Sequence, residues 1–160
     1  MSVNTQNYKA IIEKCKQHNA VLVAVSKTKP IADIQELYDE GHRDFGENYV
    51  QELTEKYEAL PKDIRWHFIG HLQSNKVKYI APFVHLIHGI DSEKLLKEIN
   101  KQAGKNSRTI NCLLQVHIAE EETKFGLDEQ ELHDTIQKVI EHSYTHINLQ
   151  GLMGMASFSD

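Results

Sequence analysis

The stretch Val21–Pro30, which reads Val-Leu-Val-Ala-Val-Ser-Lys-Thr-Lys-Pro, decides the fold of this 160-residue chain. Its first five residues are all apolar, a pattern typical of a strand that is covered on both faces in a parallel sheet. A dinucleotide-binding open sheet would place glycines in the turn after such a strand, and this turn contains none. The stretch therefore favours a (β/α)8 barrel over a doubly wound open sheet.

The same strand-and-helix unit recurs along the chain. Strands are predicted at residues 21–25, 42–45, 65–69, 83–90, 109–118 and 147–155, and helices at 31–40, 49–60, 74–80, 92–102 and 128–142. This alternation implies right-handed βαβ units and a parallel sheet. A (β/α)8 barrel needs eight strands and about 200 residues or more. We therefore expect one α/β barrel domain over residues 1–160 that holds about six of the eight strands and is incomplete.

An amphipathic helix is predicted before the first strand, within residues 1–19. Its apolar side chains are spaced three or four apart, which places them on one helical face, and they are Tyr8, Ile11, Ile12 and Cys15. We expect this face to belong to the core.

The composition of the chain argues against nucleic acids and membranes as partners. The chain carries 18 Lys and Arg against 23 Asp and Glu, a net charge of -5, which argues against nucleic acid because phosphate binding needs a basic face. No apolar run reaches the roughly 20 residues of a transmembrane helix, so no membrane partner is expected. The two cysteines, Cys15 and Cys112, fit reduced thiols in a cytoplasmic protein, and Cys112 is expected in the core.

Lys27 is the strongest candidate for chemistry. It follows the first apolar strand, at the edge of the sheet where barrels of this kind carry their active sites. Partial burial and the nearby charge of Lys29 would lower the pKa of its amine, and a neutral amine forms a Schiff base with an aldehyde. On position alone, a solvated lysine at the end of a strand is the alternative interpretation.

Other polar residues follow the predicted strands. Asn48, His67 and Gln73 could exchange hydrogen bonds with a ring hydroxyl or a carboxylate. For Asn48 and Ser74, which precede helices, capping is an equally good interpretation. The acidic run Glu120–Glu122 is expected to be a solvated loop.

Ten histidines invite a metal hypothesis. The candidate pairs are His67 with His71, His85 with His88, and His142 with His146. Residues three apart on a strand point to opposite faces, and neither Cys-x-x-Cys nor His-Glu-x-x-His occurs. No metal site is therefore expected.

Five segments together resemble one family. They are Val23–Pro30, Phe45–Glu52, Trp66–Lys76, Thr123–Gly126 and Gly151–Met155. In order and spacing they are similar to the signatures of the pyridoxal phosphate homeostasis proteins (the YggS/PROSC family), and the resemblance runs from Val21 to Asp160.

The resemblance implies a fold, a cofactor and a role. The fold would be the alanine racemase N-terminal barrel of fold-type III, and Lys27 would hold pyridoxal 5'-phosphate (PLP) as an aldimine. Asn48 would lie near the ring, with His67 and Met153 lining the pocket. The protein would be a cytoplasmic monomer that buffers PLP and delivers it to apoenzymes, without an established turnover.

The chain also departs from the family pattern. The family's main phosphate-binding segments, of Ser-Met-Gly-Met-Ser and Gly-Ser/Thr-Arg-Ile-Gly type, do not occur in these 160 residues. Two alternatives stay open at this point. One is a PLP-dependent amino-acid racemase, which would need a tyrosine from an additional β-domain. The other is an aldolase-like enzyme that uses Lys27 on its substrate without PLP.

Overall fold

The computed structural model describes residues 3–118, 126–141 and 144–155. The strands of this part of the chain form one sheet in the order β1-β2-β3-β4-β5-β6, and every neighbouring pair is parallel. Their bounds are β1 Ala24–Val25, β2 Asp44–Glu47, β3 Arg65–Phe68, β4 Leu86–Ile90, β5 Ile110–Val116 and β6 Ile147–Gly154. The helices are α1 Thr5–Gln17, α2 Ile31–Asp39, α3 Val50–Ala59, α4 Val77–Ile80 (after a 3-10 turn at Ser74–Lys76), α5 Glu93–Lys105 and α6 Glu129–Ile140.

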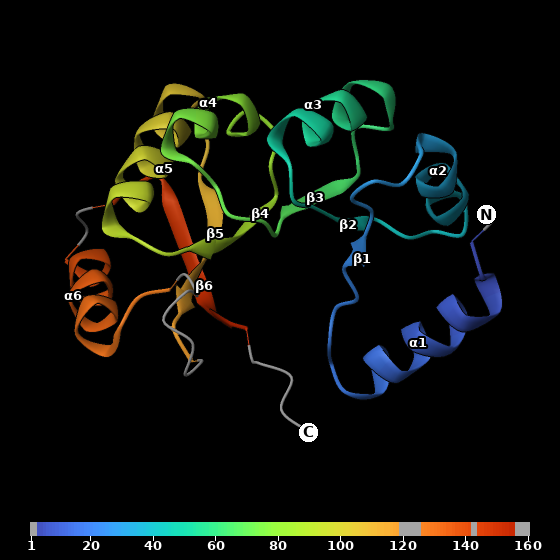
Figure 1. Cartoon of the computed structure of the whole chain (residues 1–160), viewed down its shortest axis with the longest axis horizontal. Helices are drawn as coiled ribbons and strands as arrows, with labels where there is room; N and C mark the ends of the chain where they lie inside the picture. The colour runs from blue at the N-terminus through green and yellow to red at the C-terminus, as the bar shows by residue number, and fades with distance from the viewer. Residues whose placement is uncertain (1–2, 119–125, 142–143, 156–160) are drawn as a thin grey trace.

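The order of the strands identifies the architecture. Each strand lies beside the next one in the chain, and helices α2 to α5 follow one another along one side of the sheet (Figure 1). A doubly wound sheet would reverse direction at a switch point, whereas a (β/α)8 barrel winds one way throughout. The predicted barrel-type fold with six strands is therefore confirmed.

The core lies between the sheet and helices α2 to α5. Successive residues of a strand point to opposite faces, so Phe45 and Trp66, which pair in register, both lie on the helix side. Trp66, Phe45 and Leu53 of α3 are fully buried there. Asp44, Gly46 and His67 point to the other, inner face of the sheet, and they too are buried.

Two expectations about the N-terminal part are wrong. Val21 and Val25 are 71% and 54% exposed, although a continuous apolar run predicted cover on both faces. The reason is that β1 is an edge strand, which pairs with β2 alone among the described residues. The predicted core face of α1 is only half-buried, and its Ile11 is exposed.

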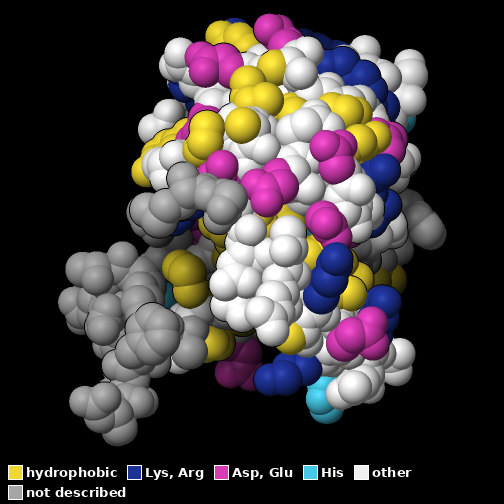
Figure 2. All heavy atoms as spheres, turned by 90° about the vertical axis from the view of Figure 1, so that its right-hand side faces the viewer, with side chains coloured by type: hydrophobic (Ala, Val, Ile, Leu, Met, Phe, Trp, Pro, Cys, Tyr) yellow, Lys and Arg dark blue, Asp and Glu magenta, His cyan; other side chains and the backbone are white. Residues whose placement is uncertain are grey.

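Helix α1 makes polar contacts with the segment around α2. Its Tyr8 hydroxyl lies 3.2 Å from Nδ1 of His42, and Lys9 pairs with Glu40 at 2.9 Å. Over α1 and α2, Figure 2 shows basic and acidic side chains interspersed rather than separated into patches. Among the described helices, none has the length and apolar character needed to cross a membrane.

Candidate functional site

Lys27 lies in the turn that joins β1 to α2, just beyond the carboxyl end of β1. The amide of Lys29 donates to the Ser26 carbonyl at 3.0 Å, and Thr28 between them has a φ of 62°. The Lys27 side chain is exposed, so the expected partial burial of its amine is wrong for this structure. The physical reason is the edge position of β1, which leaves one side of the turn uncovered.

A buried ionic cluster lies beneath this turn, and no pattern in the sequence predicted it. The ammonium of Lys56, on α3, lies 2.7 Å from Glu47 Oε1 and 2.6 Å from Glu52 Oε1. It also donates to the Ser26 carbonyl at 2.7 Å. The Ser26 hydroxyl donates to Glu47 Oε1 at 2.6 Å. The cluster therefore joins β2 and α3 to the residue that precedes Lys27.

The carboxyl groups of this cluster have opposite pKa shifts. Burial raises the pKa of Glu47, although hydrogen bonds from Lys56 and Ser26 oppose the shift. For Glu52, burial alone would raise the pKa, but hydrogen bonds from Lys56 and from the Thr28 amide outweigh burial and lower it. Glu47 is fully buried, whereas Glu52 keeps some contact with solvent.

Asn48 follows β2 at the same edge of the sheet as Lys27. The capping interpretation is wrong, because Tyr49 is the N-cap of α3 and no side chain caps that helix. Asn48 Oδ1 is buried and has no hydrogen-bond partner among the described residues. Gly70, just after β3, lies so close that a β-carbon there would stand 2.5 Å from the Asn48 carbonyl oxygen.

A hollow of about 590 Å³ adjoins Asn48. It is lined partly by Phe68, the last residue of β3, and by His71 and Gln73, which follow that strand. Ser74, also considered as a cap, lies in the 3-10 turn, where no side chain caps the helix. Asn48 Oδ1 is an acceptor without a partner among the described residues, but it is buried, so a ligand in the hollow would reach it only after a local movement.

His67 and Met153 lie near the carboxyl ends of β3 and β6. Val25, Gly46 and His67 share one level of the sheet, since Val25 pairs with Gly46 and Gly46 with His67. Lys27 is two residues beyond that level, in the turn that follows β1. Met153 pairs with Gln115 and is half-buried. The four predicted residues thus belong to one end of the sheet: Lys27 and Asn48 lie just after β1 and β2, and His67 and Met153 lie on β3 and β6.

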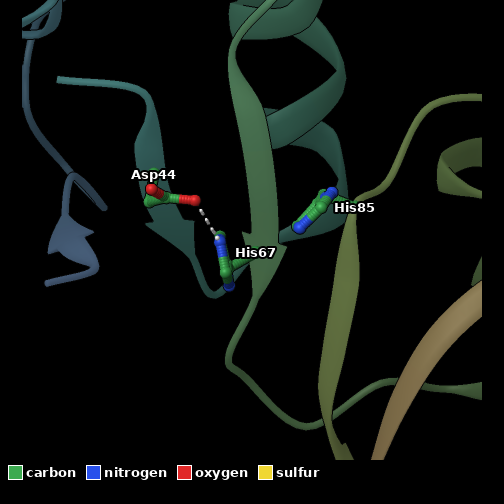
Figure 3. Close-up of side chains that lie close together, drawn as sticks. All are labelled: Asp44, His67 and His85. Carbon is green, nitrogen blue, oxygen red and sulfur yellow. Dashed lines mark hydrogen bonds and ion pairs between the residues drawn. The ribbon is translucent and has the colours of Figure 1, made fainter. Parts of the chain in front are cut away.

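His67 belongs to a polar cluster on the inner face of the sheet, and Figure 3 shows three of its members. His67 Nε2 lies 3.0 Å from Asp44 Oδ1, and one ligand-type atom each of Asp44, His67 and His85 lies within 4.8 Å of the others. Burial lowers the pKa of both His67 and His85. Neutral imidazoles and a carboxylate are suitable ligands for zinc.

Arg65 makes this cluster an ion-pair network rather than an open metal site. Its guanidinium contacts both oxygens of Asp44, at 2.7 and 2.5 Å. For Asp44, burial would raise the pKa, but hydrogen bonds from Arg65 and His67 lower it. A cation would have to displace or face this guanidinium. The histidine pairs chosen by sequence spacing missed Asp44, because the register of β2 and β3 brings it to His67 from 23 residues away.

Some predicted features fall outside the described residues. They are Glu120–Glu122, most of the segment Thr123–Gly126, and His142.

Comparison with known proteins gives consistent matches. The family described as alanine racemase, N-terminal domain, matches residues 4–160. A curated "Pyridoxal phosphate homeostasis protein" of Pasteurella multocida is 35% identical over 97% of this chain and 68% of its own length. One of the same name from Aquifex aeolicus is 43% identical over 84% of this chain and 58% of its own length. The chain thus spans about three fifths to two thirds of these relatives.

Solved structures agree in fold. PipY of Synechococcus elongatus, solved with PLP bound, has a TM-score of 0.77 and 34% identity, and the match covers 88% of this chain and 65% of PipY. The alanine racemase of Bartonella henselae has a TM-score of 0.62 over 82% of this chain and 37% of its own, at 16% identity. The second match shows a shared fold alone.

Proposed function

Since the chain belongs to the pyridoxal phosphate homeostasis proteins, within the alanine racemase N-terminal domain family, we propose that it binds PLP covalently through Lys27. The observation that carries the proposal is the position of Lys27 in the turn after β1, at the end of the sheet where barrels of this type bind ligands. The PLP bound to PipY, a relative of similar fold, supports it.

The residues at this end of the sheet fit such a ligand. PLP supplies an aldehyde, which reacts reversibly with an amine. Lys27 would hold the cofactor through its amine, and the aldehyde would supply a linkage that a second amine can reverse, which suits storage and release. Asn48, which follows β2 at this end of the sheet, would lie near the ring, and His67 and Met153 would line the pocket.

The role that follows is storage and delivery of the cofactor rather than turnover. The curated relatives carry homeostasis in their names, and the likeness to alanine racemases is one of fold alone. We infer that the protein acts as a cytoplasmic monomer that passes PLP to apoenzymes. The two free thiols, Cys15 and Cys112, are compatible with that compartment.

The proposal is tested by trapping the bond. The protein is incubated with PLP, reduced with borohydride, digested, and mapped by mass spectrometry. We expect the pyridoxyl label on Lys27, its loss in Lys27→Ala, and its retention in the matched control Lys29→Ala. An unchanged label in Lys27→Ala would refute the proposal. Racemisation of alanine at enzyme-like rates would favour a racemase, and trapping of a sugar phosphate instead of PLP would favour an aldolase.

A further inference from the structure

We propose that Glu47, Glu52 and Lys56 are positioning residues for Lys27, because they hold the backbone on both sides of it. The inference rests on the proposed function, since it treats Lys27 as the reacting amine. It assigns a role to a charged cluster that contacts the backbone of the turn, and of which Glu52 also lines the hollow beside Asn48.

The cluster makes hydrogen bonds with the residues on either side of Lys27, which are Ser26 and Thr28. On the side of Ser26, the carbonyl accepts from Lys56 Nζ at 2.7 Å, and the hydroxyl donates to Glu47 Oε1 at 2.6 Å. On the side of Thr28, the backbone amide donates to Glu52 Oε1 at 2.6 Å. The residue before Lys27 and the residue after it are therefore both tied to one cluster.

Lys56 is the centre of the cluster. Its ammonium has three protons and meets three acceptors, which are Glu47 Oε1, Glu52 Oε1 and the Ser26 carbonyl. The Lys56 side chain is 6% exposed and that of Glu47 is fully buried. All three protons of the Lys56 ammonium have an acceptor, whereas Glu47 Oε2 is buried without a partner among the described residues. A buried ammonium is stable only where such acceptors surround it, so Lys56 holds its three partners in one arrangement.

The turn itself needs such support. Thr28 has a φ of 62°, in the left-handed region that a β-branched residue rarely adopts. A conformation of this kind persists when surrounding contacts enforce it. The hydrogen bond from the Thr28 amide to Glu52 is such a contact, because it is made by the strained residue itself.

The cluster should therefore decide which lysine of the turn reacts. Lys27 and Lys29 are both exposed and lie two residues apart. With residues 26 and 28 held, the Cα–Cβ direction of Lys27 is fixed relative to the end of the sheet. Without the cluster, the turn can relax, and we expect the preference for Lys27 over Lys29 to fall.

The test measures this preference directly. The wild type, Glu52→Ala and Lys56→Met are reacted with PLP, reduced with borohydride and digested, and the ratio of label on Lys27 to label on Lys29 is determined. We expect the ratio to fall about tenfold in both variants, which corresponds to about 1.4 kcal/mol. The matched control is Lys97→Met on α5, which breaks an exposed pair with Glu93 at the same four-residue spacing. It should leave the ratio unchanged.

Folding is separated from positioning by a second pair of variants. Glu52 is partly exposed, so Glu52→Ala is expected to fold even if Lys56→Met does not. Glu52→Gln keeps an acceptor for the Thr28 amide and should restore most of the ratio. A folded Glu52→Ala with the wild-type ratio would overturn the inference alone. A wild type without label on Lys27 would overturn the proposed function and the inference together.

Discussion

Nδ1 of His67 lies 2.9 Å from Nε2 of His88, so the imidazoles of neighbouring strands share a hydrogen bond. In this hydrogen bond one nitrogen must donate and the other must accept. If His67 donates through Nε2 to Asp44, its neutral ring has no proton on Nδ1, so Nδ1 accepts from Nε2 of His88. Burial, with a smaller contribution from the charge of His67, lowers the pKa of His88 to about 4. The pair is therefore neutral at pH 7.

The neutral His88 makes stability depend on pH. Its pKa is about 4 in the folded chain and near 6.5 when unfolded, so the unfolded chain takes up the proton first as the pH falls. The stabilisation is complete above about pH 6.5 and is lost between pH 6.5 and 4. We expect the free energy of unfolding in urea to fall by ~2 kcal/mol from this source between pH 7 and 4.5.

The variant His88→Asn isolates this effect. It should show a shallower dependence of stability on pH than the wild type. The control His133→Asn, at an exposed position of α6, should keep the wild-type dependence. If His88→Asn and the wild type lose stability in parallel as the pH falls, the assignment to His88 is wrong.

Zinc should not stabilise the wild-type chain, because Arg65 contacts both oxygens of Asp44. In Arg65→Gln the carboxylate becomes available to a cation beside His67 and His85. We expect zinc to raise the melting temperature of that variant, with a stabilisation of ~2.7 kcal/mol at a hundredfold excess over Kd. Added His85→Ala should abolish the rise. A wild type that zinc stabilises equally would show that Arg65 does not control the cluster.

The order of the elements and the position of Lys27 could be predicted because both depend on local signals. The apolar run Val21–Val25 predicted a parallel strand, of which Ala24–Val25 forms β1, and the turn without glycine favoured a barrel over an open sheet. The exposure of Val21 and Val25 could not be predicted in this way, because it depends on which strands flank β1.

The buried clusters were not predicted either, because they depend on how strands and helices far apart in the sequence are placed beside one another. Glu47 meets Lys56 because β2 leads into α3, which packs on it, and Ser26 joins them from 21 residues away in the sequence. A lysine and a glutamate nine residues apart carry no recognisable signal of a buried pair. The buried ionic cluster beneath the turn could therefore be recognised only in the three-dimensional structure.

Gly70→Ala tests the close approach of β3 to the residue after β2. A β-carbon at residue 70 would lie 2.5 Å from the Asn48 carbonyl oxygen and 2.8 Å from its Cα, both of them backbone atoms. We expect a destabilisation of about 1–3 kcal/mol in urea unfolding, together with weaker PLP labelling. An unchanged midpoint of unfolding would show that the two segments separate without cost.

The two thiols should differ in reactivity. Burial raises the pKa of Cys112 to about 12, and its side chain is inaccessible, whereas Cys15 is half-buried on α1. A thiol reagent at pH 7.5 should modify one cysteine per native chain and two in denaturant. Cys15→Ser should remove the native reaction. Rapid modification of Cys112 in that folded variant would contradict its burial.

Removal of Lys56 should reveal the cost of a buried carboxylate. Lys56→Met leaves Glu47 buried without its cation, and breaking such a pair costs about 3–5 kcal/mol. Burial already raises the pKa of Glu47, so without Lys56 this group should take up a proton more readily in the folded chain. A group whose pKa is raised in the folded state stabilises that state at low pH, and this stabilisation is lost as the pH rises. The free energy of unfolding of Lys56→Met should therefore be lowest near neutral pH.

The double variant Glu47→Gln with Lys56→Met separates the lost ion pair from the stranded charge. A neutral amide needs no counter-ion, so we expect the double variant to regain about half of the stability that Lys56→Met loses at pH 7, and to lose the added pH dependence. Lys97→Met, at an exposed pair, should cost no more than about 1 kcal/mol at any pH. If the double variant is no more stable than Lys56→Met in urea unfolding, the loss comes from packing of the lysine stem and not from the charge on Glu47.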